Sequence, residues 1–182
     1  APGPDGAYSP AMRSFIAGVL ARAGEICAFT NPVPGSYARF GSFEAPRYVA
    51  WSHQNRSQLI RIPAAPAPEY ARIEVRMPDV SCNPYLAFAL LLAAGFEGME
   101  RKMELAEETP YDLYTANAGA LEALPASLEE AIARAGGSAF VEKVLSADTA
   151  RKYLALKQAE QNRWFAARDK EKYQDEAYFG VL

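Results

Sequence analysis

The chain has 182 residues, of which half are hydrophobic, and its 22 acidic and 19 basic side chains give a formal net charge of −3. This length suits one domain or one large piece of a domain, and the charge gives no reason to expect nucleic-acid binding. The only histidine is His53, which excludes a metal site built from several histidines of this chain. The first residues lack the pattern of a signal peptide, and the longest apolar run, Tyr85 to Phe96, is shorter than the roughly 20 residues that span a bilayer. We therefore expect a cytoplasmic protein without a membrane partner.

The first predicted element is a helix that begins at Ser9 and Pro10. Ser9 suits the N-cap and Pro10 the first helical position, and the stretch "AMRSFIAGVLARAGEICAF" continues with apolar side chains at helical spacing. Asn31 and the prolines after it end this pattern. The stretch "NPVPGSYARFGSFEAP" is then expected to be a long loop that holds Arg39 and Glu44. Long loops inside compact domains are usually functional or mobile.

Three short strands are predicted next, in the stretches "RYVAWS", "SQLIRIP" and "ARIEVRM". The prolines of "APAPE", between the last two stretches, exclude the interior of a ladder at that point. Asn83 and Pro84 then begin a predicted helix that runs to about Met103. Because the first half of this helix is apolar all round, we expect it to lie deep in the core.

The last part of the chain is predicted to be helical after a polar connection. The connection "ELAEETPYDLYTANAGALEALP" shows only weak helical pieces, Ser127 and Glu130 form a capping-box pattern before a short helix, and a long amphipathic helix begins at Ser146. Strands followed by helices predict the fold class α+β. Residues 1–105 are expected to carry the sheet and the candidate site, and residues 106–182 a C-terminal helical region of the same domain.

Charged residues alternate with apolar ones in the second and third predicted strands. Arg61 stands between two isoleucines, and Arg72, Glu74 and Arg76 occupy every second position, so a strand puts these charges on one face. Arginine suits bidentate capture of carboxylate or phosphate, and a carboxylate among arginines suits a hard cation such as Mg²⁺. Such a face is either an anion-binding platform or a salt-bridged sheet face turned to solvent, and the alternation leaves both open.

Four stretches form an ordered series: "NPVPGSYARFGSFEAP", "NRSQLIRIP", "RIEVRMPD" and "CNPYLAFALLLAAGFEGM". In this order and at nearly this spacing they resemble the C-terminal part of the catalytic domain of the glutamine synthetase family, from roughly Ser9 to Lys102. The resemblance implies an α+β fold in which helices flank an antiparallel sheet platform. It also implies an ATP-dependent ligase of nitrogen metabolism, in which glutamate and ATP give γ-glutamyl phosphate and ammonia then displaces the phosphate.

The resemblance assigns roles to the residues that would contact glutamate. Arg39 and Arg76 would hold its carboxylate end, and Arg56 would lie near the acyl phosphate. Glu44 would belong to a mobile flap that closes over the site and helps to deprotonate the incoming ammonium. Glu44 and Arg56 are therefore the implied catalytic residues, and both would also bind glutamate.

The resemblance also implies an ATP and metal site. Arg56 and Arg61 would neutralise the ATP phosphates, and Glu74 would be one ligand of the Mg²⁺ or Mn²⁺ that bridges them. In the family, an N-terminal β-grasp domain and further motifs supply the other metal ligands, and these would precede Ala1. The chain would then carry half of an active site and be inactive by itself. Family members form homo-oligomeric rings, and the end of this chain, "EAYFGVL", could contact a facing ring.

Three features depart from the common family pattern or add to it. The stretch between Arg39 and Glu44 is one residue shorter than usual, and Glu69 stands where bacterial members often have a lysine that touches ATP. Because the shape of the flap should decide which amine enters, a γ-glutamyl ligase for methylamine or a polyamine is an alternative, and a non-catalytic family member is another. Tyr111, in "TPYDLY", matches a tyrosine that is adenylylated in some bacterial members, which makes it a candidate modification site.

Overall fold

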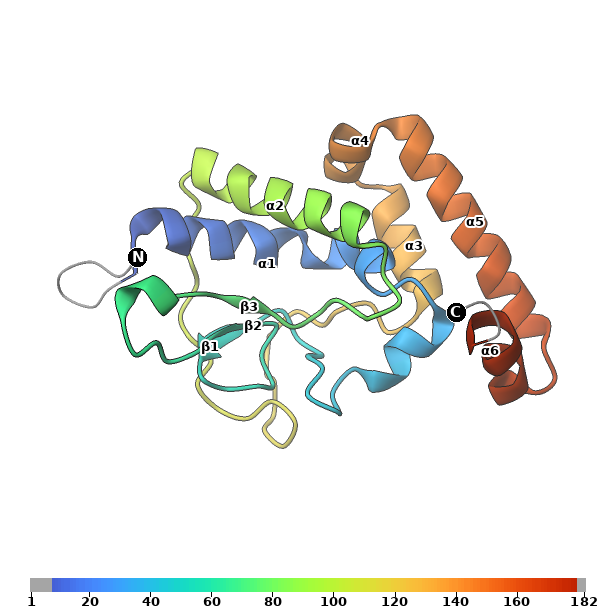
Figure 1. The fold of residues 1–182 in the computed structure, drawn as a ribbon, viewed down its shortest axis with the longest axis horizontal. Helices are drawn as coiled ribbons and strands as arrows, with labels where there is room; N and C mark the ends of the chain where they lie inside the picture. Colours follow the sequence, from blue (N-terminus) through green and yellow to red (C-terminus); the bar gives the residue numbers. More distant parts are fainter. Residues whose placement is uncertain (1–7, 180–182) are drawn as a thin grey trace.

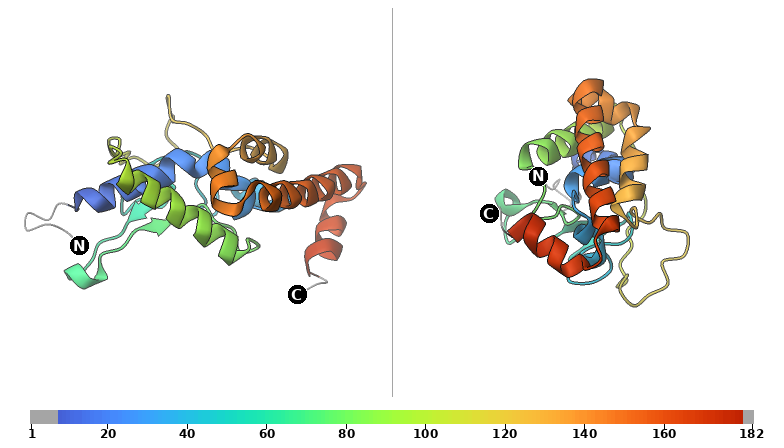
Figure 2. Two further views of the ribbon diagram at one scale, coloured as in Figure 1. Left: turned by 90° about the horizontal axis from the view of Figure 1, so that it is seen from above. Right: turned by 90° about the vertical axis from the view of Figure 1, so that its right-hand side faces the viewer.

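The computed structural model describes residues 8–179, which form six α-helices, two 3₁₀ helices and one three-stranded sheet. The helices are α1 (Pro10–Thr30), α2 (Pro84–Glu100), α3 (Leu128–Gly136), α4 (Ala139–Leu145), α5 (Ala147–Ala166) and α6 (Lys170–Tyr178). The strands are β1 (Trp51–His53), β2 (Ile60–Ile62) and β3 (Glu74–Val75), and the 3₁₀ helices are η1 (Pro34–Arg39) and η2 (Pro68–Tyr70). Figures 1 and 2 show α1 and α2 side by side, and α5 and α6 at the end of the molecule farthest from the start of α1. This mixture of helices with a small sheet confirms the α+β class.

Helix α1 begins where the sequence predicts. Pro10 is its first residue, and the Ser9 hydroxyl accepts a hydrogen bond from the Met12 amide at 3.2 Å, so one of the unpaired donors of the first turn is satisfied. The second half of the helix is buried, including Ile26 and Phe29. Its core cluster also contains residues of β1 and β2 and of α2 to α5, which makes α1 the central element of the fold.

Helices α1 and α2 cross in backbone contact. A Cβ atom on Gly98 of α2 would lie 2.1 Å from the Ser14 carbonyl oxygen of α1, and one on Gly95 would collide with the Phe15 ring. The two helices can approach this closely only because these positions carry no side chain. The crossing covers one side of α2.

The sheet has the strand order β1–β2–β3, and each strand is only two or three residues long. β2 and β3 pair antiparallel, with Arg61 opposite Glu74, as the predicted platform requires. β1 and β2, however, run parallel, so the sheet is mixed and not wholly antiparallel. The reason is that the connection 54–59 turns back along β1 instead of making a hairpin, and the buried Gln58 anchors it to the backbone of residues 109–111.

Helix α2 does not lie deep in the core, contrary to our expectation. It begins at Pro84 as predicted, with the Asn83 side chain accepting hydrogen bonds from the amides of the first turn. Leu90 is fully buried, but Phe88 is 64% exposed and Leu92 is 48% exposed. The described residues pack against one side of a helix whose first half is apolar all round, so the other side of that half is left in contact with solvent.

The connection between α2 and α3 contains no helix within residues 8–179, so its expected weak helical pieces are absent there. It is held against β1 by hydrogen bonds instead. The Trp51 indole donates to the Ala106 carbonyl oxygen at 2.9 Å, the Thr109 amide donates to the Trp51 carbonyl oxygen at 3.0 Å, and the His53 amide donates to the Glu108 carboxylate at 2.8 Å. These bonds lay the connection beside the sheet.

The C-terminal helices begin at the predicted caps. The Ser127 hydroxyl accepts from the Glu130 amide at 3.2 Å before α3, and Ser146 caps α5. The Tyr153 hydroxyl of α5 donates to a backbone oxygen of α1 at 3.1 Å, so this region shares the core described above. The final residues of the tail predicted to contact a facing ring, 180–182, lie outside the described residues. Among the helices of residues 8–179, none is both long and apolar enough to cross a membrane.

Candidate active site

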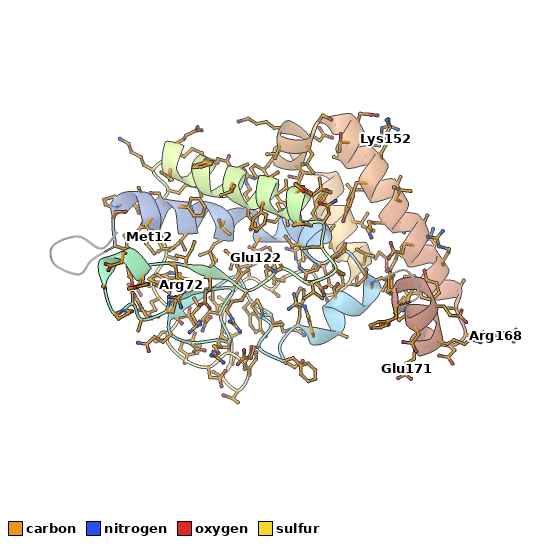
Figure 3. The ribbon with its side chains drawn as sticks, viewed as in Figure 1. Met12, Arg72, Glu122, Lys152, Arg168 and Glu171 are labelled. Carbon is orange, nitrogen blue, oxygen red and sulfur yellow. The ribbon has the colours of Figure 1, made fainter. Side chains whose placement is uncertain are left out.

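Three arginines surround the carboxylate of Glu74 on the β2–β3 face. Arg61 donates to Glu74 Oε2 from Nε at 2.9 Å and from Nη2 at 2.6 Å. Arg72 Nη2 lies 3.5 Å from Glu74 Oε1, and Arg76 Nη1 lies 3.7 Å from Oε2. The side chains of Arg61 and Arg76 are each only 15% exposed, whereas Arg72, labelled near the strands in Figure 3, is 53% exposed. The structure therefore contains the charged sheet face that the alternation predicts.

Glu44 joins this face from the loop that follows η1. Its Oε1 accepts a hydrogen bond from Arg56 Nη1 at 2.7 Å, while Arg76 Nη2 donates to the Glu44 carbonyl oxygen at 2.9 Å and lies 3.4 Å from its Oε2. The hydrogen bond from Arg56 lowers the pKa of the Glu44 carboxyl below its ordinary value, and the same contact raises the pKa of Arg56. Arg76 thus bridges the two carboxylates of the site, Glu44 and Glu74.

The loop that carries Glu44 has an unusual backbone. Phe43 and Glu44 have φ angles of 49° and 60°, in the left-handed region that costs a residue with a side chain about 1–2 kcal/mol. Gly41, with φ of 84°, adopts the same region without this cost, and its amide closes the turn on the Ala45 carbonyl oxygen at 3.1 Å. The strained conformation places the Glu44 carboxylate at the arginines, while the Phe43 side chain, 91% exposed, points away into solvent.

Arg39, which the resemblance assigns to the same site, has other side-chain partners within residues 8–179. Its guanidinium donates to the Asn31 side chain at 2.7 Å and to the Met77 carbonyl oxygen, and its Nε lies 3.5 Å from Asp79. Burial lowers the pKa of Arg39, and the nearby Asp79 offsets part of that effect. These partners tie the loop to α1 and to the segment after β3, so Arg39 has an evident structural role.

The sequence reasoning missed the support of Arg56. Asn55 Nδ2 donates to the Tyr111 carbonyl oxygen at 2.9 Å, Gln58 Nε2 donates to the same oxygen at 3.0 Å, and Ser57 Oγ accepts from the Leu113 amide at 2.9 Å. The segment 55–58 is thereby fastened to residues 109–114. The only signal in the sequence is the run of polar residues on both sides of Arg56, which is too common to identify a partner so far along the chain.

Comparison with known proteins identifies the family. Residues 2–175 match the family described as glutamine synthetase, catalytic domain. The chain belongs to the glutamine synthetase family. The glutamine synthetase of Methanosarcina mazei is 43% identical over 158 residues, which are 84% of this chain and 35% of that protein. The glutamine synthetase of Thermotoga maritima is 45% identical over 130 residues, 68% of this chain and 29% of that protein.

Two solved structures are similar to this chain in fold. A GmaS/ADP complex matches with a TM-score of 0.80 and 25% identity, over 99% of this chain and 42% of that one. Apo GmaS without ligand matches with a TM-score of 0.77 and 26% identity, over 96% of this chain and 39% of that one. The chain spans about a third of the length of the two named glutamine synthetases. The roles of individual residues stay predictions, namely those of Arg39, Glu44, Arg56, Arg61, Glu74, Arg76 and Tyr111.

Glu74 can supply one ligand to the divalent ion that the glutamine synthetase family implies. Within residues 8–179 no three His, Cys, Asp or Glu side chains gather where they could hold a metal ion. Mg²⁺ usually binds through one or two carboxylates together with substrate phosphates. A single carboxylate on a face rich in arginine fits that pattern, because the arginines can hold the phosphates that complete the coordination. The residues present therefore fit one part of such a site.

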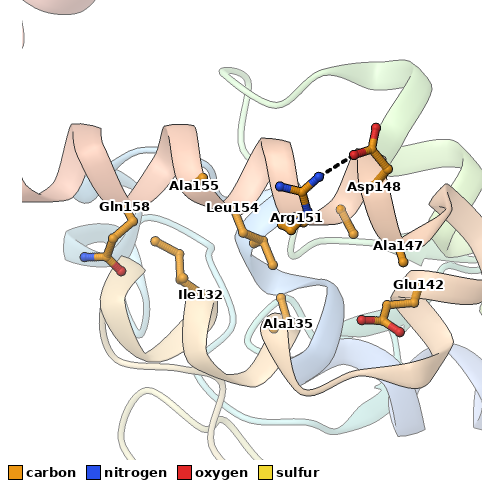
Figure 4. A pocket seen from close by; sticks show the side chains of 11 residues that line it. Ile132, Ala135, Glu142, Ala147, Asp148, Arg151, Leu154, Ala155 and Gln158 are labelled. Atoms are coloured by element: carbon orange, nitrogen blue, oxygen red, sulfur yellow. Dashed lines mark hydrogen bonds and ion pairs between the residues drawn. The ribbon is translucent and has the colours of Figure 1, made fainter.

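A separate hollow of about 630 Å³ lies between α3 and α5 (Figure 4). Ile132, Ala135 and Leu154 form part of its apolar lining, and its arginine, Arg151, is already paired with Asp148 at 2.5 Å. Phosphoryl transfer from ATP needs several positive charges near one point. The cluster around Glu74 offers them and this hollow does not, so the cluster is the candidate active site of the glutamine synthetase fold.

Proposed function

We propose that the chain is the C-terminal part of the catalytic domain of an ATP-dependent glutamate–ammonia ligase. The observation that carries the proposal is the cluster on β2, β3 and the flap loop. There four arginines meet only two carboxylates, Glu44 and Glu74, which leaves a net charge of +2 in one place. Membership of a family whose relatives are named glutamine synthetase supports a ligase, and the match to an ADP complex supports an adenine nucleotide as a ligand.

The positive charge suits the first half-reaction, transfer of the γ-phosphoryl group of ATP to the γ-carboxylate of glutamate. Such transfer requires of the protein mainly positioning and stabilisation of negative charge. Arg56 and Arg61 would neutralise the phosphates, and Arg76 and Arg39 would hold the carboxylate end of glutamate. Arg76 is already part of the cluster, whereas Arg39 would have to contribute while bound to Asp79.

Glu74 would hold the divalent ion from this chain. Bound Mg²⁺ or Mn²⁺ supplies charge neutralisation on the phosphates during transfer. The two hydrogen bonds from Arg61 to Glu74 Oε2 fix the direction of the carboxylate. The remaining metal ligands would come from parts of the longer protein that correspond to the rest of the relatives' length.

Glu44 would serve the second half-reaction. Its lowered pKa keeps it ionised at neutral pH, and a carboxylate on the flap can take a proton from an incoming ammonium. To do so it must exchange its contact with Arg56 for one with the substrate. A flap that covers the site would also keep water from the acyl phosphate, which water hydrolyses.

A γ-glutamyl ligase for methylamine or a polyamine is the second candidate. It is favoured by the flap, which is one residue short between Arg39 and Glu44 and presents Phe43 to solvent. The shape of this loop would decide which amine reaches the acyl carbon. The two candidates share the first half-reaction and differ only in the amine.

The experiment is to express the full-length protein and measure phosphate release from ATP with glutamate and a panel of ammonia, methylamine and polyamines. Ammonia-dependent release supports the glutamate–ammonia ligase, and release only with larger amines supports the second candidate. Arg61→Met should lower kcat/KM at least about 100-fold, because it removes a charge from the phosphate site. The matched control Arg151→Met, on α5, should stay within about twofold. If the folded protein releases no phosphate with any of the amines, the result would favour a non-catalytic family member.

We also propose that the isolated 182-residue chain is inactive and that the full-length protein forms a homo-oligomeric ring. The first statement rests on the coverage, since the chain spans 35% of the Methanosarcina mazei protein, and the second rests on the resemblance to a family whose members form rings. Turnover by the chain alone would contradict the first. A monomeric mass of the active full-length protein in sedimentation would contradict the second.

A further inference from the structure

The carbonyl oxygen of Arg56 accepts hydrogen bonds from two other residues. The Tyr114 hydroxyl donates to the Arg56 carbonyl oxygen at 3.2 Å, and Arg76 Nε donates to the same oxygen at 3.1 Å. A carbonyl oxygen has two lone pairs, so these two donors fill it. Tyr114, which lies in the connection between α2 and α3, therefore contacts the charged cluster through the backbone of Arg56.

The neighbours Asn55, Ser57 and Gln58 fasten the segment on both sides of Arg56, but the Arg56 side chain itself has few partners. Its side chain is 59% exposed, and among residues 8–179 its ion-pair partner is Glu44. The segment that carries it lies in the irregular connection between β1 and β2, directly after Gln54, whose φ of 60° is in the left-handed region. The position of the guanidinium thus depends on where the Arg56 backbone is held.

We propose that Tyr114 is a positioning residue for the ligase reaction, an inference that rests on the proposed function. Its hydroxyl keeps the Arg56 carbonyl oxygen beside Arg76 Nε, which in turn leaves Arg76 Nη2 directed at the Glu44 carbonyl oxygen. One hydrogen bond from the connection thereby fixes both the arginine expected at the acyl phosphate and the flap carboxylate. Tyr114 acts through Arg56 and does not itself contact substrate.

The same loop supplies a matched control. Tyr111 is also a partly exposed tyrosine, but it meets Asn55 and Gln58 through its backbone oxygen, which a change of side chain preserves. Tyr114→Phe and Tyr111→Phe each remove one hydroxyl from the same segment. A general effect on the loop would appear in both variants, whereas the proposed effect belongs to Tyr114→Phe alone.

The first readout is steady-state phosphate release by the full-length protein. Tyr114→Phe should lower kcat about fivefold, the equivalent of one ordinary hydrogen bond, and change the KM for ATP by less than kcat, because Arg61 and Glu74 still hold the phosphates and their ion. In protein that carries no adenylyl group, Tyr111→Phe should leave both constants unchanged. A structural role alone would lower the melting temperature of Tyr114→Phe while kcat of the folded enzyme stayed constant, and that result would overturn the inference.

The second readout does not require turnover. Amide hydrogen exchange, followed by mass spectrometry, should be faster in Tyr114→Phe than in the parent protein over residues 41–47 and 54–58. Faster exchange confined to residues 109–117, or equal changes in both variants, would overturn the inference. If the parent protein releases no phosphate, the proposed function fails, and the exchange data still decide whether Tyr114 holds the Arg56 segment.

Discussion

The contact between α1 and α2 allows the sharpest test of the fold. In Gly18→Ala, a methyl group would enter the crossing of the two helices. The new Cβ would lie 2.1 Å from the Ala94 carbonyl oxygen and 2.8 Å from Gly98 N and Cα, whereas ordinary contacts begin at 3.4 Å. All of these neighbours belong to the backbone of α2, so no side-chain rotation can relieve the overlap.

The magnitude follows from two opposing effects. The overlap with Ala94 amounts to about 1.3 Å, so α2 must move away from α1 and loosen the contacts of buried Leu90. Overpacking of this kind costs up to about 3 kcal/mol. Replacing glycine by alanine within a helix returns about 1 kcal/mol. The net loss in the free energy of unfolding is then about 2 kcal/mol, or a melting temperature lower by roughly 6 °C in a chain of this size.

The assay is urea unfolding of the 182-residue chain followed by circular dichroism, with Gly136→Ala as the matched control. Gly136 is the last residue of α3, and the nearest atom to its added Cβ, on Leu154, would be 4.0 Å away. The control should be unchanged or more stable by up to about 1 kcal/mol. Equal or greater stability of Gly18→Ala than of the parent chain, with the control as expected, would refute the close crossing of α1 and α2.

Three further predictions concern groups described above. Arg39→Met should lower the free energy of unfolding by about 2 kcal/mol, because the half-buried Asp79 loses its counter-ion, and combining it with Asp79→Asn should cost less than the sum of the single changes. The arginine hydrogen bond lowers the pKa of Glu44 below 4.5, so its stabilisation is present at neutral pH and lost as the pH falls through the folded-state pKa. The melting-temperature difference between the parent and Glu44→Gln should therefore shrink as the pH falls below the ordinary glutamate pKa of about 4.3, and a constant difference from pH 7 to 3 would contradict this origin. Phe88→Gln with Leu92→Gln should reduce binding of the dye ANS while changing the free energy of unfolding by less than about 0.5 kcal/mol, and undiminished ANS binding would show that the exposed face of α2 is not its site.

Features set by a few neighbouring residues could be predicted from the sequence. Ser9 and Pro10 determine the start of α1 through the amides of the next turn, and Ser127 and Ser146 do the same for α3 and α5. The alternation around Glu74 places its neighbours on one face because side chains in a strand alternate between the two faces. None of these features depends on distant parts of the chain.

Features that depend on distant partners could not be predicted. The guanidinium of Arg39 is held by Asp79, and a sequence does not show which carboxylate 40 residues away an arginine will meet. The parallel pairing of β1 with β2 depends on the contact of Gln58 with residues 109–111. The exposed side of α2 could not be predicted for the same reason. The apolar composition of the helix shows that much of its surface needs to be buried, but not which residues bury it.

The central claim is that glutamate is activated as an acyl phosphate at this site. In that reaction a γ-carboxylate oxygen attacks the γ-phosphorus of ATP and ADP leaves; the amine then attacks the acyl carbon, and the carbon–oxygen bond breaks. The phosphate released therefore keeps one oxygen of the carboxylate. We would supply the full-length protein with glutamate labelled with ¹⁸O in its γ-carboxylate, together with ATP and the active amine, and determine the mass of the phosphate. One ¹⁸O atom in each phosphate is the predicted result, whereas unlabelled phosphate, formed by attack of water on ATP, would contradict the account.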